Sequence, residues 1–273
     1  VMNSLSKHYP VGSKIRKPVF VIVLNIAACL LAVPLLILMV QKATALITGD
    51  KETFFSTIKL LGQGFAYSFG IFFFTILFSL PLGLTVAAGK MSKIKTVSAF
   101  FKIYVSVLRG TPLMLQLLLV YFGPYYLFGV TTGNIQIGPF NYRFIATIIG
   151  FSLNYAAYFA EIFRGGIQSM PKGQYEAAQV LGFSKMQTYF KIIMPQVVKR
   201  VLPSVGNEVI TLVKDTSLAQ VLAVTEMFTQ ASALASAQVS VMPFIIAGLF
   251  YYLMNFIIEM LLGLLEKSMR TTE

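Results

Sequence analysis

Long runs without a single charged residue constrain this chain more than any other feature of its sequence. A helix needs about 20 apolar residues to cross the roughly 30 Å hydrocarbon core of a bilayer. Runs of that length or longer lie at 19–40, 60–89 and 110–142. Only 12% of the 273 residues are charged, whereas an average soluble domain has about 25%. The sequence therefore predicts an integral membrane protein.

Three more candidate spans follow, at 144–160, at 204–226 and at 243–265. The segment 204–226 is the most polar of the three, and 110–142 must contain a loop besides its span. The first run, 19–40, has no small-residue cleavage pattern after it, so we expect a spanning helix and not a signal peptide. The sequence thus predicts an all-α, polytopic membrane helix bundle with six spans.

The distribution of basic residues predicts the orientation of these spans. Four segments, before the first span, after the second, between the fourth and fifth and after the sixth, contain Lys7, Lys14, Arg16, Lys17, Lys90, Lys93, Lys95, Arg164, Lys172, Lys185, Lys191, Lys199, Arg200, Lys267 and Arg270. Six spans place all four segments on one side, which is the cytoplasmic side. Both termini are therefore predicted to be cytoplasmic.

The net charge of +12 does not indicate nucleic-acid binding, because the basic residues alternate with apolar runs instead of forming one soluble face. The single cysteine, Cys29, excludes an intrachain disulfide and cannot form a zinc site alone. We expect no metal site and no nucleic-acid partner.

The loop at about 163–200 has helical signals of its own. Pro171 suits a first helical turn and Gly182 the position after a helix end. Ser184 and Gln187 have the spacing of a capping box, and Pro195 is expected to end or kink the helix that follows. These signals predict a helix, a turn and a second helix at the cytoplasmic surface. On physical grounds alone, an amphipathic hairpin resting on lipid headgroups remains an alternative.

The same loop contains Glu176, Ala177 and Ala178, then Gly182 four positions later, then Ile192 and Pro195. This pattern resembles the EAA loop of ABC-importer permeases, in which leucine stands at the position of Met194. Three further stretches are similar to the polar-amino-acid branch of that family, the histidine/glutamine/arginine permease-like proteins: 109–113, 157–167 and 214–218.

The resemblance covers 60–268 and implies a five-helix, type I ABC-importer permease core. Residues 1–59, with one extra N-terminal spanning helix, fall outside it, and 269–273 form a short tail. It also implies an ABC ATPase partner that receives the loop helix, and we expect this docking to involve Tyr175, Glu176, Ala177, Ala178, Leu181 and Gly182. The chain has no phosphate-binding Gly-x-x-x-x-Gly-Lys-Ser/Thr motif, so ATP and Mg are expected on the ATPase, and no catalytic residue or cofactor in this chain.

The other implied partners are an extracytoplasmic binding protein, a second permease copy or paralogue, an amino-acid substrate and membrane lipid. The expected place is the bacterial cytoplasmic membrane. The expected mechanism is alternating access driven by ATP on the partner chain.

Charged residues inside spans are costly and need an explanation. At helical spacing, Asn154, Tyr158 and Glu161 share one face, which suits a zwitterionic amino acid with its ammonium near Glu161. Alternatively, Glu161 pairs with Arg164 or Arg109 and holds helices together. The sequence leaves both roles open for these three substrate-path candidates.

The fifth predicted span has a polar stripe formed by Glu208, Thr211, Asp215 and Glu226. Lys214 and Asp215 are expected to pair across a helix contact or to face a central cavity, in a structural or gating role. Arg109 opens an apolar stretch and can extend to the interface. Together with Arg164, these residues are the structural candidates.

Two other classes of protein compete with the importer. A secondary transporter would use Glu161 and Asp215 as ion or proton sites, but it has no need of an EAA loop. A membrane assembly factor would not need the polar stripe inside the spans. The sequence therefore favours the importer subunit.

Overall fold

The computed structural model describes residues 34, 37, 38, 40, 41, 51–130, 135–138 and 140–270. The chain divides into two compact units, Val1–Thr57 and Ile58–Glu273, and nearly all of the described structure belongs to the second. Almost the whole predicted first span, at 19–40, lies outside the described residues.

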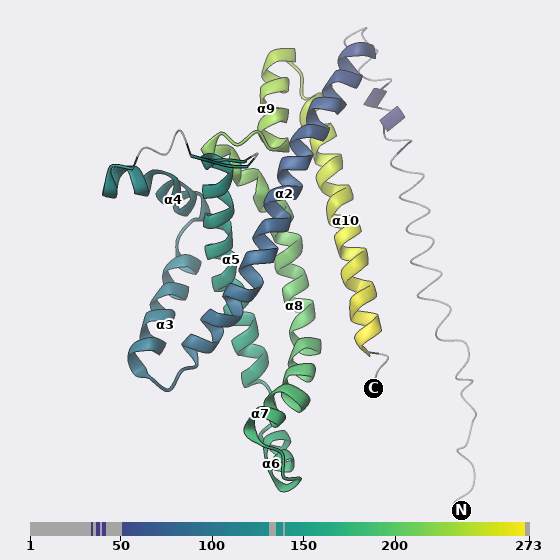
Figure 1. Cartoon of the computed structure of the whole chain (residues 1–273). Helices are drawn as coiled ribbons and strands as arrows, with labels where there is room; N and C mark the ends of the chain where they lie inside the picture. The colour runs from purple at the N-terminus through teal and green to yellow at the C-terminus, as the bar shows by residue number, and fades with distance from the viewer. Residues whose placement is uncertain are drawn as a thin grey trace, which may run out of the picture. The chain divides into compact units, whose positions relative to one another are not determined.

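The second unit is built from helices (Figure 1). In chain order the helices are α2 (Lys51–Lys90, which begins in the first unit), α3 (Lys95–Gly110), α4 (Leu113–Phe128), α5 (Tyr142–Gln168), α6 (Lys172–Val180), α7 (Lys185–Gln187), a π-helix (Thr188–Ile193), α8 (Met194–Asp215), a 3₁₀-helix (Thr216–Leu222), α9 (Met227–Gln238) and α10 (Met242–Arg270). Before α5, the short strands β1 (Gln136–Ile137) and β2 (Phe140–Asn141) pair antiparallel. The prediction of an all-α bundle is confirmed.

Three of the described helices are long and apolar enough to cross a membrane: Glu52–Lys90, Tyr142–Gln168 and Met242–Met269. They contain the predicted spans at 60–89, 144–160 and 243–265. The pair α3 and α4 meets the same criteria jointly, with a bend of 113° between them. The described part of the chain thus has several spanning helices, as the apolar runs predicted.

The predicted span within 110–142 differs from the structure, because its helix starts earlier and is broken. Thr111 adopts an extended conformation (φ −120°, ψ 150°) between α3 and α4. This is the conformation that a following proline, here Pro112, favours. Helix α3 is therefore the first half of a bent pair, and α4 is the second half.

The predicted fifth span, at 204–226, is wrong as one helix. The helix α8 starts ten residues earlier, at Met194, and continues directly from the π-helix, so Pro195 does not end a helix. It ends at Asp215, a 3₁₀-helix follows, and Ala223 then adopts a left-handed conformation (φ 52°). Glu226 begins a different helix, α9.

The core of the second unit surrounds α5. In the most apolar 18-residue stretch of α5, 61% is buried inside the protein, compared with 17% in the most apolar stretch of α10. Phe151, Tyr155 and Phe159 on α5 are fully buried or nearly so, and α5 contacts α3, α4 and α8. Helix α5 therefore carries its polar side chains into contact with three other helices.

Candidate coupling segment and polar clusters within the bundle

The segment between α5 and α8 has the helix, turn and second helix that the sequence predicted. Pro171 precedes α6, and the capping box of Ser184 and Gln187 is formed at the start of α7. Figure 1 shows α6 and α7 together at the end of the bundle opposite α9. We call 171–193 the coupling segment.

Gly182 makes the sharp turn of this segment. Its φ is +77°, and an added Cβ would meet nothing within 4 Å, so the constraint is conformational and not steric. The N–H of Phe183 donates to Ala178 O at 3.0 Å, and the N–H of Gly182 donates to Gln179 O at 3.0 Å. This is the Schellman pattern that ends many helices.

The structure separates the six predicted docking residues into two groups. Ala178 is 1% exposed and packs inside the segment. The other five, Tyr175, Glu176, Ala177, Leu181 and Gly182, are exposed. The exposed face also includes large apolar side chains that the sequence did not single out: Val180, Met186 and Phe190. Partial burial, with a contribution from Tyr175, raises the pKa of the Tyr189 phenol above its ordinary value.

Glu161 lies between two cations. Its Oε1 accepts from Lys90 Nζ, and its Oε2 accepts from Arg164 Nε at 3.1 Å and from Nη2 at 2.7 Å. The predicted partner Arg164 is present, whereas Lys90, the last residue of α2, was missed. The Lys90 bond joins the end of α2 to α5, whereas Arg164 lies on the same helix as Glu161.

Asn154 supports the break between α3 and α4. Its Nδ2 donates to Leu108 O at 3.0 Å and to Gln116 Oε1 at 2.9 Å. In turn, Gln116 Nε2 donates to Leu108 O at 2.8 Å and to Thr111 O at 3.0 Å. Gln116 was missed, although a lone amide in an apolar run is a detectable signal. These bonds satisfy carbonyl groups that the broken helix leaves without partners.

Tyr158 faces a different neighbour from Asn154 and Glu161. The Arg109 guanidinium carbon lies 5.0 Å from the centroid of the Tyr158 ring, within the range of a cation–π interaction. The structure thus gives the three substrate-path candidates separate partners.

Asp215 contacts α5 at the end of α8. Its Oδ2 accepts from Tyr155 Oη at 2.7 Å, and Tyr155 is 2% exposed. Lys214, the neighbour with which pairing was predicted, is exposed. Asp215 therefore connects α8 to the buried face of α5.

Glu226, which the sequence placed on a span, is the fully buried N-cap of α9, with 0% exposure. It accepts from the N–H of Phe228 at 2.8 Å, from the N–H and hydroxyl of Thr229 at 2.7 and 2.9 Å, from Tyr251 Oη at 3.0 Å and from Ser68 Oγ at 3.2 Å. Ser68 Oγ also accepts from the N–H of Met227 at 3.1 Å. One carboxylate thus ties α2, α9 and α10 together.

Several helices long and apolar enough to span a membrane, with an exposed helical segment between α5 and α8, define a multi-pass membrane protein. Residues 79–271 match the family described as binding-protein-dependent transport system inner membrane component, and the chain belongs to that family. Membership implies an ATPase and a substrate-binding protein as partners in general.

Relatives with assigned functions resemble most of the chain. The L-cystine transport system permease protein TcyB of Bacillus subtilis (strain 168) is 33% identical over 212 residues, which are 77% of this chain and 86% of TcyB. The arginine transport system permease protein ArtQ of the same organism is 33% identical over 217 residues, 79% of this chain and 95% of ArtQ.

A solved structure described as an amino acid ABC transporter with histidines is also similar. Its matched chain is 33% identical to this one, with a TM-score of 0.71, and the match covers 80% of this chain and 98% of that one. The helical fold and the family assignment therefore agree.

Proposed function

We propose that this chain is the transmembrane subunit of an ATP-driven importer that moves a polar or charged amino acid into the cell by alternating access. The observation that carries the proposal is the exposed coupling segment, with its turn at Gly182, in a chain whose relatives are amino-acid transport permeases. An ion-driven carrier has no use for such a segment. ATP and Mg bind to the separate ATPase subunits, and a binding protein delivers the amino acid from outside.

The coupling segment docks in a groove of the ATPase. Its exposed apolar side chains include Tyr175 (38% exposed), Leu181 (73%) and Val180 (86%), and a short helix with such a face suits a hydrophobic groove. The Glu176 carboxylate is exposed beside this face and pairs with a basic residue of the partner. The basic residues of the loops support a cytoplasmic position for this segment and for both termini.

The transport domain comprises 60–268 and works as a pair with a second copy or a paralogue. Of the three substrate-path candidates, Tyr158 is the one beside a cation, Arg109, and this neighbourhood supports contact of Tyr158 with the substrate, because a cation suits the substrate carboxylate. The two cations around Glu161 favour the structural role for that residue over contact with the substrate ammonium.

Reconstitution tests the proposal. The chain alone in liposomes should neither hydrolyse ATP nor accumulate amino acids. Addition of its ATPase should give hydrolysis, and further addition of the loaded binding protein should give uptake. Uphill uptake driven by a sodium or proton gradient without ATP would contradict the proposal.

A further inference from the structure

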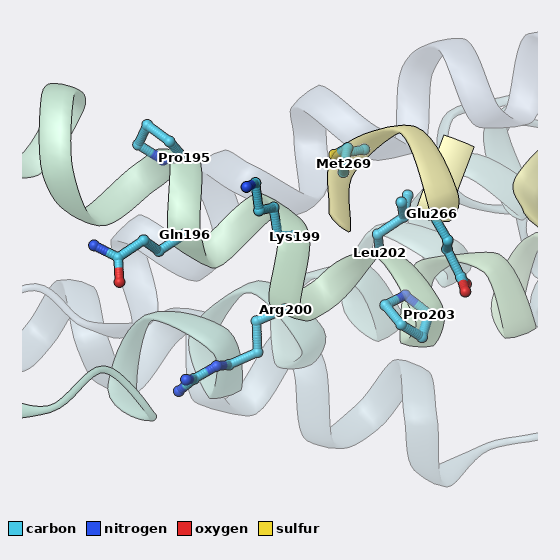
Figure 2. A pocket seen from close by; sticks show the side chains of 8 residues that line it. All are labelled: Pro195, Gln196, Lys199, Arg200, Leu202, Pro203, Glu266 and Met269. Carbon is cyan, nitrogen blue, oxygen red and sulfur yellow. The ribbon is translucent and has the colours of Figure 1, made fainter. Parts of the chain in front are cut away.

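The start of α8 and its second half differ in how their charged side chains are bonded. Figure 2 shows Lys199 and Arg200 on α8 around a cavity that also contacts Glu266 on α10. Arg200 is engaged there, since its Nη1 donates to Ser169 O at 2.7 Å and to Ser169 Oγ at 3.0 Å. About two turns further along α8, the Glu208 side chain forms no hydrogen bond and no ion pair with any residue that the structure describes.

Glu208 lies at the depth of the membrane interior. Tyr155 is the central residue of the 27-residue spanning helix α5, and Asp215, at the end of α8, bonds to it. Glu208 precedes Asp215 by roughly 10 Å along the helix, which is less than the roughly 15 Å from the middle of the hydrocarbon core to its edge. A carboxylate at this depth is costly unless it meets protein, water or a ligand.

Glu208 borders an exposed polar face of α8. Asn207, Thr211 and Lys214 are exposed and recur at the three- or four-residue spacing of one helix face. The opposite face is apolar and buried, and it includes Val209, Leu212 and Val213. A polar face at this depth meets water or another protein surface and not lipid.

Arg109 provides a charge of the opposite sign. Its guanidinium carbon lies 5.0 Å from the centroid of the Tyr158 ring, and Tyr158 follows the central Tyr155 by less than one helical turn, so Arg109 is also at interior depth. The charge of Arg109 acts on Glu208, but the two side chains form no ion pair, which requires a distance of about 4 Å or less between N and O. They are close enough to interact and too far apart to bond.

We propose that Arg109 and Glu208 bind the charged head of an α-amino acid, with the substrate carboxylate on Arg109 and the substrate ammonium on Glu208. The inference rests on the proposed function, because it assigns a site to the transported molecule. Both contacts are charge-assisted hydrogen bonds. The substrate side chain extends along the polar face at Asn207 and Thr211.

The proposal defines a substrate class. An amine or a simple carboxylic acid carries only one of the two charges, so it leaves either Arg109 or Glu208 without a partner. The site therefore selects free α-amino acids by the head that they share. Glu161 takes no part, since its two oxygens already accept from Lys90 and Arg164.

The test uses the chain in complex with its ATPase, in detergent and without the binding protein. The probe is the amino acid that the reconstituted importer takes up from a mixture of the protein amino acids and L-cystine. Two analogues of the probe are compared with it: the amine, which lacks the carboxylate, and the acid, which lacks the α-ammonium. Affinity is measured as the shift in melting temperature on titration, and the amino acid should bind at least tenfold more tightly than either analogue.

Two variants assign the charges. Glu208→Gln should weaken binding of the amino acid roughly ten- to hundredfold, since it removes a hydrogen bond between charged groups, and should not weaken binding of the acid. Arg109→Gln should weaken binding of the amino acid by a similar factor and should not weaken binding of the amine. Glu259→Gln, at an exposed carboxylate on α10, is the matched control and should leave all three affinities unchanged.

Two results would overturn this site and leave the proposed function intact. If Glu208→Gln or Arg109→Gln weakened binding of the amino acid and of both analogues equally, these residues would hold the helices and not the ligand. If the complex imported the amino acid but the chain did not bind it, the recognition site would lie elsewhere. A reconstituted complex without ATP-driven import would instead overturn the proposed function, and this site with it.

Discussion

Glu161 and Glu226 are both acidic side chains inside the helix bundle, but their surroundings are opposite. Glu161 accepts from the cations Lys90 and Arg164, and its side chain is 15% exposed. Glu226 is 0% exposed and accepts from neutral hydroxyl and backbone N–H groups. Two regions of one bundle therefore satisfy a carboxylate by charge in one case and by directed hydrogen bonds in the other.

The difference determines what each site tolerates. An ion pair near the end of a span keeps part of its hydration, and loss of one partner leaves a cation that can still turn toward water. The donors around a buried carboxylate cannot turn toward water, so each of them is left without an acceptor when the carboxylate is removed. We therefore expect the Glu226 site to tolerate substitution less well than the Glu161 site.

The largest effect is expected for Glu226→Ala. The substitution removes the α9 cap and the acceptor for several buried donors, which should destabilise the fold by about 3–5 kcal/mol. The measurement is thermal or denaturant unfolding in detergent. Glu259→Ala, at an exposed carboxylate on α10, is the matched control. A melting temperature equal to that of the control would mean that the donors find other acceptors.

Glu161→Gln should have a smaller effect, about 1–2 kcal/mol, because Lys90 and Arg164 are partly hydrated. Lys90→Gln in the same chain should recover part of the loss, since it removes the cation left without a counter-charge. At the other site, Ser68→Ala should not recover any of the stability lost in Glu226→Ala, because Ser68 carries no charge. Unchanged stability with lost uptake in Glu161→Gln would instead make Glu161 a substrate contact.

Gly182→Val should leave both carboxylate sites intact and act on the coupling segment alone. A β-branched residue at φ +77° costs about 1–2 kcal/mol locally, which should loosen the turn. We expect weaker ATPase association with an unchanged melting temperature. The control is Gly173→Val, at a glycine without positive φ, which should have a smaller effect on ATPase association. Full ATPase coupling in Gly182→Val would contradict the docking proposal.

The smallest effect is expected for Lys214→Gln. Lys214 is exposed, and Asp215 bonds to Tyr155, so the stability change should stay within about 0.5 kcal/mol. Asp215→Asn should change the melting temperature more. If Lys214→Gln and Asp215→Asn changed the melting temperature equally, and the double variant showed no further change, Lys214 and Asp215 would form the pair predicted from the sequence.

Local signals predicted the coupling segment well, because its turn and caps depend on residues within about five positions of one another, such as Ser184 and Gln187. The carboxylate sites were not predictable in this way. Lys90 is 71 residues from Glu161, and Ser68 is 158 from Glu226. Helical periodicity assigns a residue to a face of its own helix but does not identify the helix that packs against that face.

The fifth span shows a second limit. The polar stripe from Glu208 to Glu226 continued a helical period across residues that form a 3₁₀-helix and a left-handed Ala223. A non-glycine residue in that conformation has no signature in the sequence, since tertiary contacts impose it. The apolar spans on α2, α5 and α10 were predictable because hydrophobic length alone determines them.

The π-helix has a mechanical consequence. From Lys185 to Asp215 the backbone is helical without interruption, so the coupling segment and the Tyr155–Asp215 contact are the two ends of one rod. A displacement of α7 must either move Asp215 relative to Tyr155 or be absorbed along the rod. The π-helix at Thr188–Ile193 is the place where the displacement can be absorbed, because a π-helical turn contains more residues than an α-helical turn. The stiffness of those six residues therefore determines how much of a displacement of α7 reaches the contact between Asp215 and Tyr155.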